Sequence, residues 1–82
     1  MDYDTYDRLD DIMQQRYGVG FNPDTEEDTM RFFTRLAEQF GENELITAWG
    51  MACAQYADPI AAFSKVKGIL LNRRRFTSFI AH

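Results

Sequence analysis

Apolar residues at the start of the chain recur every three or four positions, which is the period of an amphipathic α-helix. Residues 4–17 follow this pattern, with aspartate and glutamine at most of the other positions. The apolar positions are Tyr6, Leu9, Met13 and Tyr17. Glycine, asparagine and proline then gather in residues 18–23, and these residue types favour turns. The pattern predicts a first helix followed by a loop.

The same period returns after the loop. Asp24 and Glu27 have the spacing of a capping box, which predicts the start of a second helix at this point. Gly41 predicts its end, because glycine often directly follows a helix. The apolar stripe between them consists of Met30, Phe33, Leu36, Ala37 and Phe40.

Residues 43–57 predict a third helix of a different kind. One side carries Leu45, Trp49, Ala52 and Tyr56, but the opposite side carries small and apolar residues where charges would be expected. A helix that is apolar on nearly every side is typical of the middle of a bundle. We therefore expect this helix to be central and Trp49 to be buried.

Asp58 and Pro59 predict the start of a fourth helix, because aspartate caps helix N-termini and proline suits the first helical position. We expect this helix to end near Arg74. Its buried stripe should consist of Phe63, Val66, Ile69 and Leu70.

Residues 76–82 repeat the helical spacing weakly and predict a short fifth helix or an amphipathic tail. We expect Phe76, Phe79 and Ile80 to pack on the core or on a second copy of the chain, since they would otherwise face water. The predicted fold is an all-α bundle of four to five helices, in a single domain at residues 1–82 with no strand.

The chain has 82 residues, of which 45% are hydrophobic, enough for one core but too few residues for a typical enzyme. Its single cysteine, Cys53, excludes an intramolecular disulfide. The only histidine is His82, so a nucleophilic catalytic site is implausible and a zinc ion would have only two soft ligands. We expect no catalytic residue, no metal and no cofactor.

No apolar run approaches the ~20 residues that a membrane span needs. The acidic start of the chain is also the opposite of the basic lead of a signal peptide. We therefore expect a cytoplasmic protein that does not enter a membrane.

Charge is divided unevenly along the chain. Residues 1–58 hold all thirteen acidic residues and four arginines, a net charge of −9, whereas residues 59–82 hold five cations and no acid. This polarity indicates a basic end that faces a partner. Attraction between the two halves inside the fold is the alternative, because oppositely charged side chains on neighbouring helices are common.

The basic end supplies the candidate nucleic-acid-binding residues. At 100° per residue, Lys65, Ile69 and Arg73 form one ridge of the fourth helix, and Lys67 and Arg74 lie on the other flank of its buried stripe. Because Arg73 falls close to that stripe, its aliphatic stem is expected to cover core residues. The full set is Lys65, Lys67, Ile69, Arg73, Arg74 and Arg75. The candidate partner-binding residues are Asp7, Asp10, Asp11, Phe76 and Phe79.

The segments FGENELITAW at 40–49 and AFSKVKGILLNR at 62–73 resemble the C-terminal domain of DnaD-like primosomal and phage replication proteins. The similarity covers about residues 15–75. It implies an all-helical domain that binds DNA and other initiation proteins and helps to load a replicative helicase. The family's Tyr, Ile and Trp at four-residue steps are here Lys65, Ile69 and Arg73, which favours phosphate contact over base stacking.

The function expected from these observations is a non-enzymatic module that binds DNA weakly, without sequence preference, together with a replication protein. Because the family's winged-helix domain is absent, a phage or mobile-element protein or an excised domain is expected. The alternative is a small phage inhibitor of the anti-CRISPR type, whose acidic body binds a host nucleic-acid-binding protein. A third possibility is a homo-oligomeric adaptor that associates through the aromatic tail.

Overall fold

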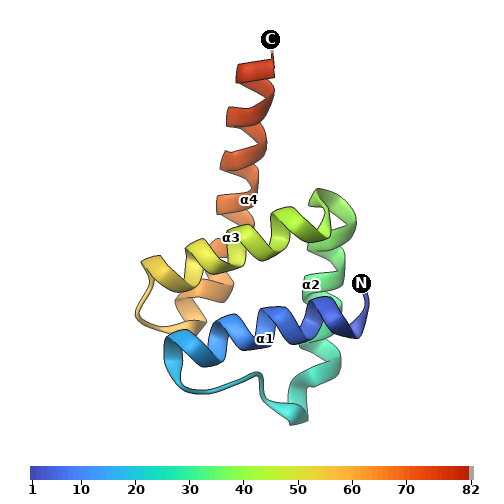
Figure 1. Cartoon of the computed structure of the whole chain (residues 1–82), viewed down its shortest axis with the longest axis vertical. Coiled ribbons are helices and arrows are strands. Elements are labelled where there is room, and N and C mark those ends of the chain that lie inside the picture. Colours follow the sequence, from blue (N-terminus) through green and yellow to red (C-terminus); the bar gives the residue numbers. More distant parts are fainter. Residues whose placement is uncertain (82) are drawn as a thin grey trace.

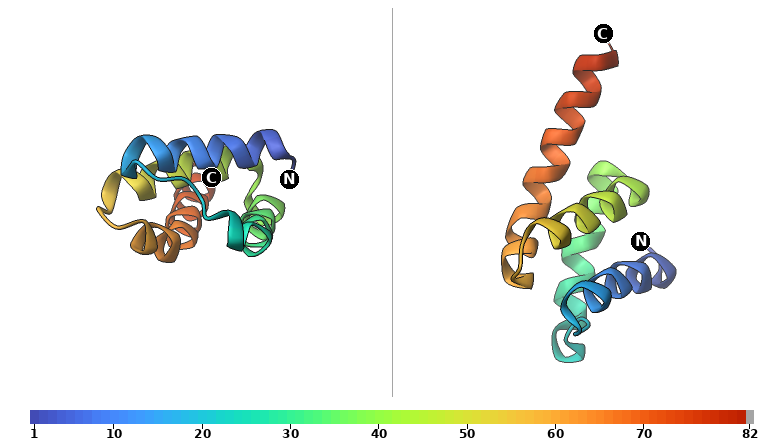
Figure 2. Two further views of the ribbon diagram at one scale, coloured as in Figure 1. Left: turned by 90° about the horizontal axis from the view of Figure 1, so that it is seen from below. Right: turned by 60° about the vertical axis from the view of Figure 1, so that its left-hand side comes forward.

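The computed structural model describes the backbone of residues 1–81 and the side chains of residues 1–75. This part of the chain forms four α-helices and no strand, as the hydrophobic pattern predicts. The elements are α1 (Tyr3–Tyr17), the 3-10 turn η1 (Pro23–Thr25), α2 (Glu26–Phe40), α3 (Glu42–Gln55) and α4 (Pro59–Ala81). In Figure 1, α1 and α3 run across the view, whereas α2 and α4 run along the long axis of the molecule. The left view of Figure 2 shows α2 and α4 nearly end-on below α1.

The centre of the bundle is α3, which packs against each of the other three helices. Trp49 is completely buried, so the prediction for this residue is confirmed. The rings of Phe21, Phe33 and Phe63 surround it, with centroids 6.2, 5.2 and 4.8 Å from the Trp49 ring. Its indole Nε1 donates a 2.9 Å hydrogen bond to the carbonyl oxygen of Leu9 in α1. The core therefore has an aromatic centre supplied by α2, α3, α4 and the loop before α2, and hydrogen-bonded to α1.

The loop between α1 and α2 is fastened by Asp10. Its carboxylate accepts a 2.7 Å hydrogen bond from the Phe21 backbone N–H and a 2.8 Å bond from Gln14 Nε2. These contacts place the Phe21 ring beside Tyr6, at a centroid distance of 5.2 Å. The loop thereby contributes an aromatic side chain to the core.

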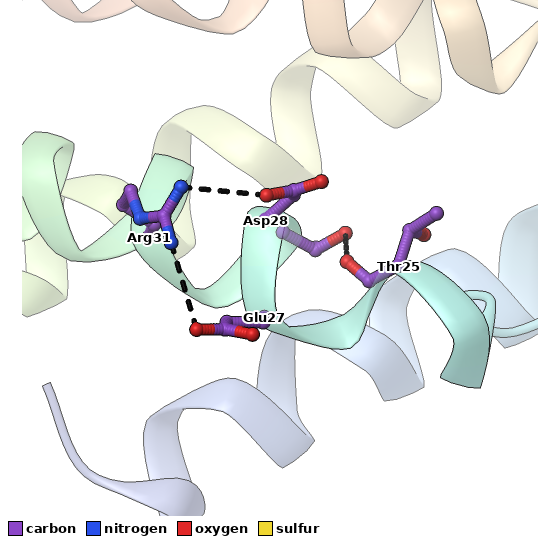
Figure 3. A network of polar contacts seen from close by, with 5 residues as sticks. Thr25, Glu27, Asp28 and Arg31 are labelled. Atoms are coloured by element: carbon purple, nitrogen blue, oxygen red, sulfur yellow. Dashed lines mark hydrogen bonds and ion pairs between the residues drawn. The ribbon is translucent and has the colours of Figure 1, made fainter.

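The start of α2 differs from the predicted capping box at Asp24. Asn22 is the capping residue, because its side-chain oxygen accepts a 2.9 Å hydrogen bond from the Asp24 N–H and begins η1. The helix itself then starts two residues after Asp24, where Thr29 Oγ1 donates to the Thr25 carbonyl. Figure 3 shows this region, in which Arg31 reaches back to two carboxylates of the first turn. The helix N-terminus is thus rich in carboxylates, which suits its dipole.

A glycine at one end of α3 and side-chain hydrogen bonds at the other end fix this helix between its neighbours. Gly41 is the single residue between α2 and α3 and has a φ of 94°, a conformation that L side chains rarely adopt. At the other end, the Tyr17 hydroxyl donates to the carbonyl oxygens of Cys53 and Tyr56, at 3.3 and 2.7 Å, and Arg16 Nε donates to Cys53 at 2.8 Å. Side chains of α1 therefore satisfy a carbonyl in the last turn of α3 and the carbonyl of its C-cap residue, Tyr56.

The longest element is α4. Asp58 caps it as predicted, since its carboxylate accepts a 2.9 Å hydrogen bond from the Ile60 N–H. The predicted end near Arg74 is wrong, because α4 continues without a break to Ala81 and leaves no separate fifth helix in the described residues. Its C-terminal turns project beyond the other three helices (Figures 1 and 2). The side chains of Phe76, Phe79 and Ile80 lie outside the described residues.

Candidate functional site

The candidate nucleic-acid-binding residues all lie on α4, and the structure gives them different surroundings. Lys65, Lys67, Arg74 and Arg75 are exposed, whereas Ile69 and Arg73 are partly buried. Lys65, Ile69 and Arg73 line one shallow groove between α3 and α4, with a volume of about 310 Å³. Met51 and Gln55 of α3, Tyr56 directly after α3, and Gly68 and Asn72 of α4 complete the groove.

Arg73 is held inside the fold by Glu44 at the start of α3. Its Nε and one terminal nitrogen bind the two Glu44 carboxylate oxygens at 2.9 and 3.1 Å, in a bidentate pair. Its other terminal nitrogen lies 3.6 Å from the Met51 sulfur. The hydrogen bonds from Arg73 lower the pKa of Glu44, and the hydrogen bond to Glu44 raises the pKa of Arg73. For this residue, attraction between the acidic and basic parts of the chain occurs inside the molecule.

Arg74 also contacts its own chain. Its guanidinium lies 4.3 Å from the centroid of the Phe40 ring, a cation–π arrangement, and it donates a hydrogen bond to the Gln39 carbonyl oxygen. This places a cation at the C-terminal end of α2, where the helix dipole is negative. Two of the five cations of α4 are therefore engaged with α2 and α3.

Lys65, Lys67 and Arg75 remain. They form no ion pair or side-chain hydrogen bond with any other residue among the side chains of 1–75. These three cations are the part of the candidate site that is available to a ligand. The set is smaller than the six residues expected from the sequence.

The acidic candidates also separate into different roles. Asp10 is partly buried and both of its oxygens accept hydrogen bonds within the chain, so it holds the loop. Asp7 and Asp11 are exposed. Phe76 and Phe79, the other expected partner-binding residues, have side chains outside the described residues.

Two adjoining hollows at the start of α1 and of α2, which we call the acidic hollows, were not predicted from the sequence. One has a volume of about 190 Å³ and is lined by Tyr3, Glu26, Glu27 and Met30. The other has a volume of about 220 Å³ and is lined by Tyr6, Asp7, Asp10, Phe21, Pro23 and Glu26. Burial, followed by the nearby charges of Glu26, Asp10 and Asp7, raises the pKa of the Tyr6 phenol. The five aspartates of residues 2–11 indicate an acidic surface on the first helix. The position of Glu26 in the sequence does not indicate that it lies beside them.

Comparisons with protein-family models, with curated proteins and with solved structures found no match to this chain. Within residues 1–81, no helix combines the length and the apolar composition needed to cross a membrane.

Proposed function

We propose that this protein is a non-enzymatic, cytoplasmic binding module that contacts nucleic-acid phosphates through α4. The observation that carries the proposal is a projecting helix whose residues 59–75 hold five cations and no acid. Lys65, Lys67 and Arg75 supply the phosphate contacts, because Arg73 and Arg74 are already engaged with Glu44 and Phe40. With so few contacts, binding is weak, independent of base sequence and steeply dependent on salt.

The resemblance to DnaD-like domains gives this binding a biological setting. In that setting the module assists helicase loading by holding DNA and a replication protein together. The departure at Lys65 supports contact with the sugar–phosphate backbone, since an exposed cation takes the position of one of the family's two aromatic residues. Arg73 takes the other position but is engaged with Glu44.

Fluorescence anisotropy with labelled single- and double-stranded DNA tests the proposal. The triple variant Lys65→Ala, Lys67→Ala, Arg75→Ala should lose binding while its circular dichroism is unchanged, because all three side chains are exposed. For the unaltered protein on double-stranded DNA, three phosphate contacts give a slope of about −2.7 in log affinity against log salt.

The matched control removes three arginines from the acidic body: Arg8→Ala, Arg31→Ala, Arg35→Ala. It has the same net charge as the α4 triple variant and keeps every cation of α4. Its affinity for DNA should fall far less. Equal losses in the two variants, or no DNA binding by the unaltered protein at low salt, would contradict the proposal.

The acidic hollows favour a second candidate function. An inhibitor that occupies the basic groove of a host nucleic-acid-binding protein needs an acidic surface, and Tyr3 and Glu26 provide aromatic and carboxylate groups for a partner's arginines. This candidate predicts no DNA binding by the chain itself. It also predicts that the protein competes with DNA for such a host protein, and that Asp7→Lys, Glu26→Lys abolishes the competition.

A further inference from the structure

The outward side of α4 carries two large apolar residues that nothing covers within the described chain. Ile60, Ser64, Lys67 and Leu71 follow one another at steps of four, three and four residues, so they share one face of the helix. Ile60 is 73% exposed and Leu71 is 45% exposed. We call these four residues the outer α4 stripe.

The surroundings of the outer α4 stripe are open and basic. A Cβ built on the neighbouring Gly68 would meet no atom within 4 Å. Lys67 lies within the stripe, Arg75 follows it one turn later, and residues 59–75 contain no acid. The surface therefore combines two apolar anchors with positive charge.

The acidic hollows have the complementary properties. Tyr3 is 68% exposed at their edge, Met30 is partly buried beside it, and Glu26 is shared by both hollows. None of the residues that line them is a cation. This surface thus combines exposed apolar groups with negative charge.

The two surfaces lie on different elements of the molecule, since the outer α4 stripe belongs to a helix that packs mainly against α3. Tyr17, at the C-terminal end of α1, binds the backbone of Tyr56 three residues before Pro59, so α4 begins beside that end. The acidic hollows are lined by residues of α1, of the loop after it and of the start of α2, and by none of α4. Both surfaces stay exposed in the folded chain, so a contact between them joins two copies of the chain.

We infer that the outer α4 stripe of one copy docks into the acidic hollows of a second copy. Leu71 supplies the apolar contact against Tyr3 and Met30, Lys67 pairs with Glu26, which both hollows share, and Ile60, about 16 Å from Leu71 along the helix, lies against the other hollow. Because the two surfaces are different, the association is head to tail and can continue into rings or open chains. Charge steers it, so it weakens as salt is added. The inference does not rest on the proposed binding of nucleic acid.

A pair of charge-reversal variants tests this contact by sedimentation velocity and light scattering at low salt. One variant, Asp7→Lys, Glu26→Lys, reverses the hollows; Glu27 is left unchanged because it pairs with Arg31. The other, Lys67→Glu, Arg75→Glu, reverses the α4 side. The unaltered protein should associate as its concentration rises, and each variant alone should stay monomeric. An equimolar mixture should associate again, because each variant keeps the surface that its counterpart lacks.

A further variant separates this contact from nucleic-acid binding. Ile60→Ser, Leu71→Ser keeps every charge, so it should lose self-association and retain any affinity for DNA. Circular dichroism checks that all variants keep their helix content. The inference is overturned if the unaltered protein is monomeric throughout, if the mixture associates no more than its components, or if association survives in Ile60→Ser, Leu71→Ser.

Discussion

At the scale of single residues, Trp49 contacts each of the other three helices and the loop before α2. The hydrophobic pattern of the sequence does not indicate these partners. Its ring packs against aromatic side chains from the loop, from α2 and from α4, and its Nε1 binds the backbone of α1. The burial of Trp49 was predictable, because its helix carries apolar or small residues on nearly every side and is therefore expected in the middle of a bundle. Its partner Leu9 was not, because a hydrogen bond across 40 residues leaves no local trace.

Replacing Trp49 with alanine should destabilise the protein by ~3 to 5 kcal/mol, through lost burial and the cavity that remains. Chemical unfolding followed by far-UV circular dichroism measures the change. Thr47→Ala, at an exposed position of the same helix, is the control and should change the free energy of unfolding by less than ~0.5 kcal/mol. A cost for Trp49→Ala as small as that of the control would show that the ring does not organise the core.

Gly20 illustrates a requirement for space. A Cβ at this position would lie 2.7 Å from Asp10 Oδ1, the atom that accepts the Phe21 N–H, and 3.0 Å from Gln14 Nε2. Gly20→Ala should therefore cost about 1 to 3 kcal/mol, because it displaces the carboxylate and leaves a backbone donor without its partner. Thermal unfolding of Gly20→Ala, Asp10→Ala and the double variant forms a cycle. If the two losses simply add, the proposed clash with Asp10 is wrong.

At the scale of elements, helix interiors were predictable and helix ends less so. The pattern of apolar residues located all four helices, because α1, α2 and α4 each bury one side against the central α3. The pair Asn22-Pro23 has the same form as Asp58-Pro59, and both begin a helical turn, so the start of η1 was readable on the same principle. The end of α4 was not, since no glycine or proline follows Arg75 and nothing stops the helix.

Deleting residues 76–82 should lower either the melting temperature or the mass in solution. The three large apolar residues of this segment follow the helical period of α4 and need a cover, in the same chain or in another. Differential scanning calorimetry and light scattering of the shortened chain check both quantities. Unchanged values would mean that the segment contributes nothing to packing or assembly.

At the scale of the whole molecule, the acidic and basic parts of the chain meet at a few particular contacts. The Glu44–Arg73 pair joins α3 to α4, and Arg74 joins α4 to α2, while Lys65, Lys67 and Arg75 are left for other ligands. The sequence predicted the division of charge, because it only requires counting. Which cations are neutralised depends on how α4 lies against α3 and α2, and periodicity carries no information about that.

The Glu44–Arg73 pair predicts how stability responds to acid. Because the folded state lowers the pKa of Glu44, this pair stabilises the protein above the ordinary glutamate pKa of ~4.3 and loses its effect as the pH falls further. The melting temperature of Glu44→Gln should therefore be lower than that of the unaltered protein at pH 7, and the gap should close in acid. The pKa of Asp2 is also lowered, mainly by the hydrogen bond from the Thr5 N–H. Because Asp2 is present in both proteins, its effect cancels in the difference between their melting temperatures. A gap that is constant with pH would contradict the role of the pair.

The central position of α3 also constrains the order in which the chain can fold during synthesis. The segments that cover it come from both sides, with α1 and α2 made before it and α4 made after it. A nascent chain that ends at Gln55 has exposed on α3 the apolar surface that Ala62, Val66 and Leu70 later cover. Completion of the core therefore awaits the release of α4 from the ribosome, and until then the nascent chain is the form most exposed to aggregation or to capture by a chaperone.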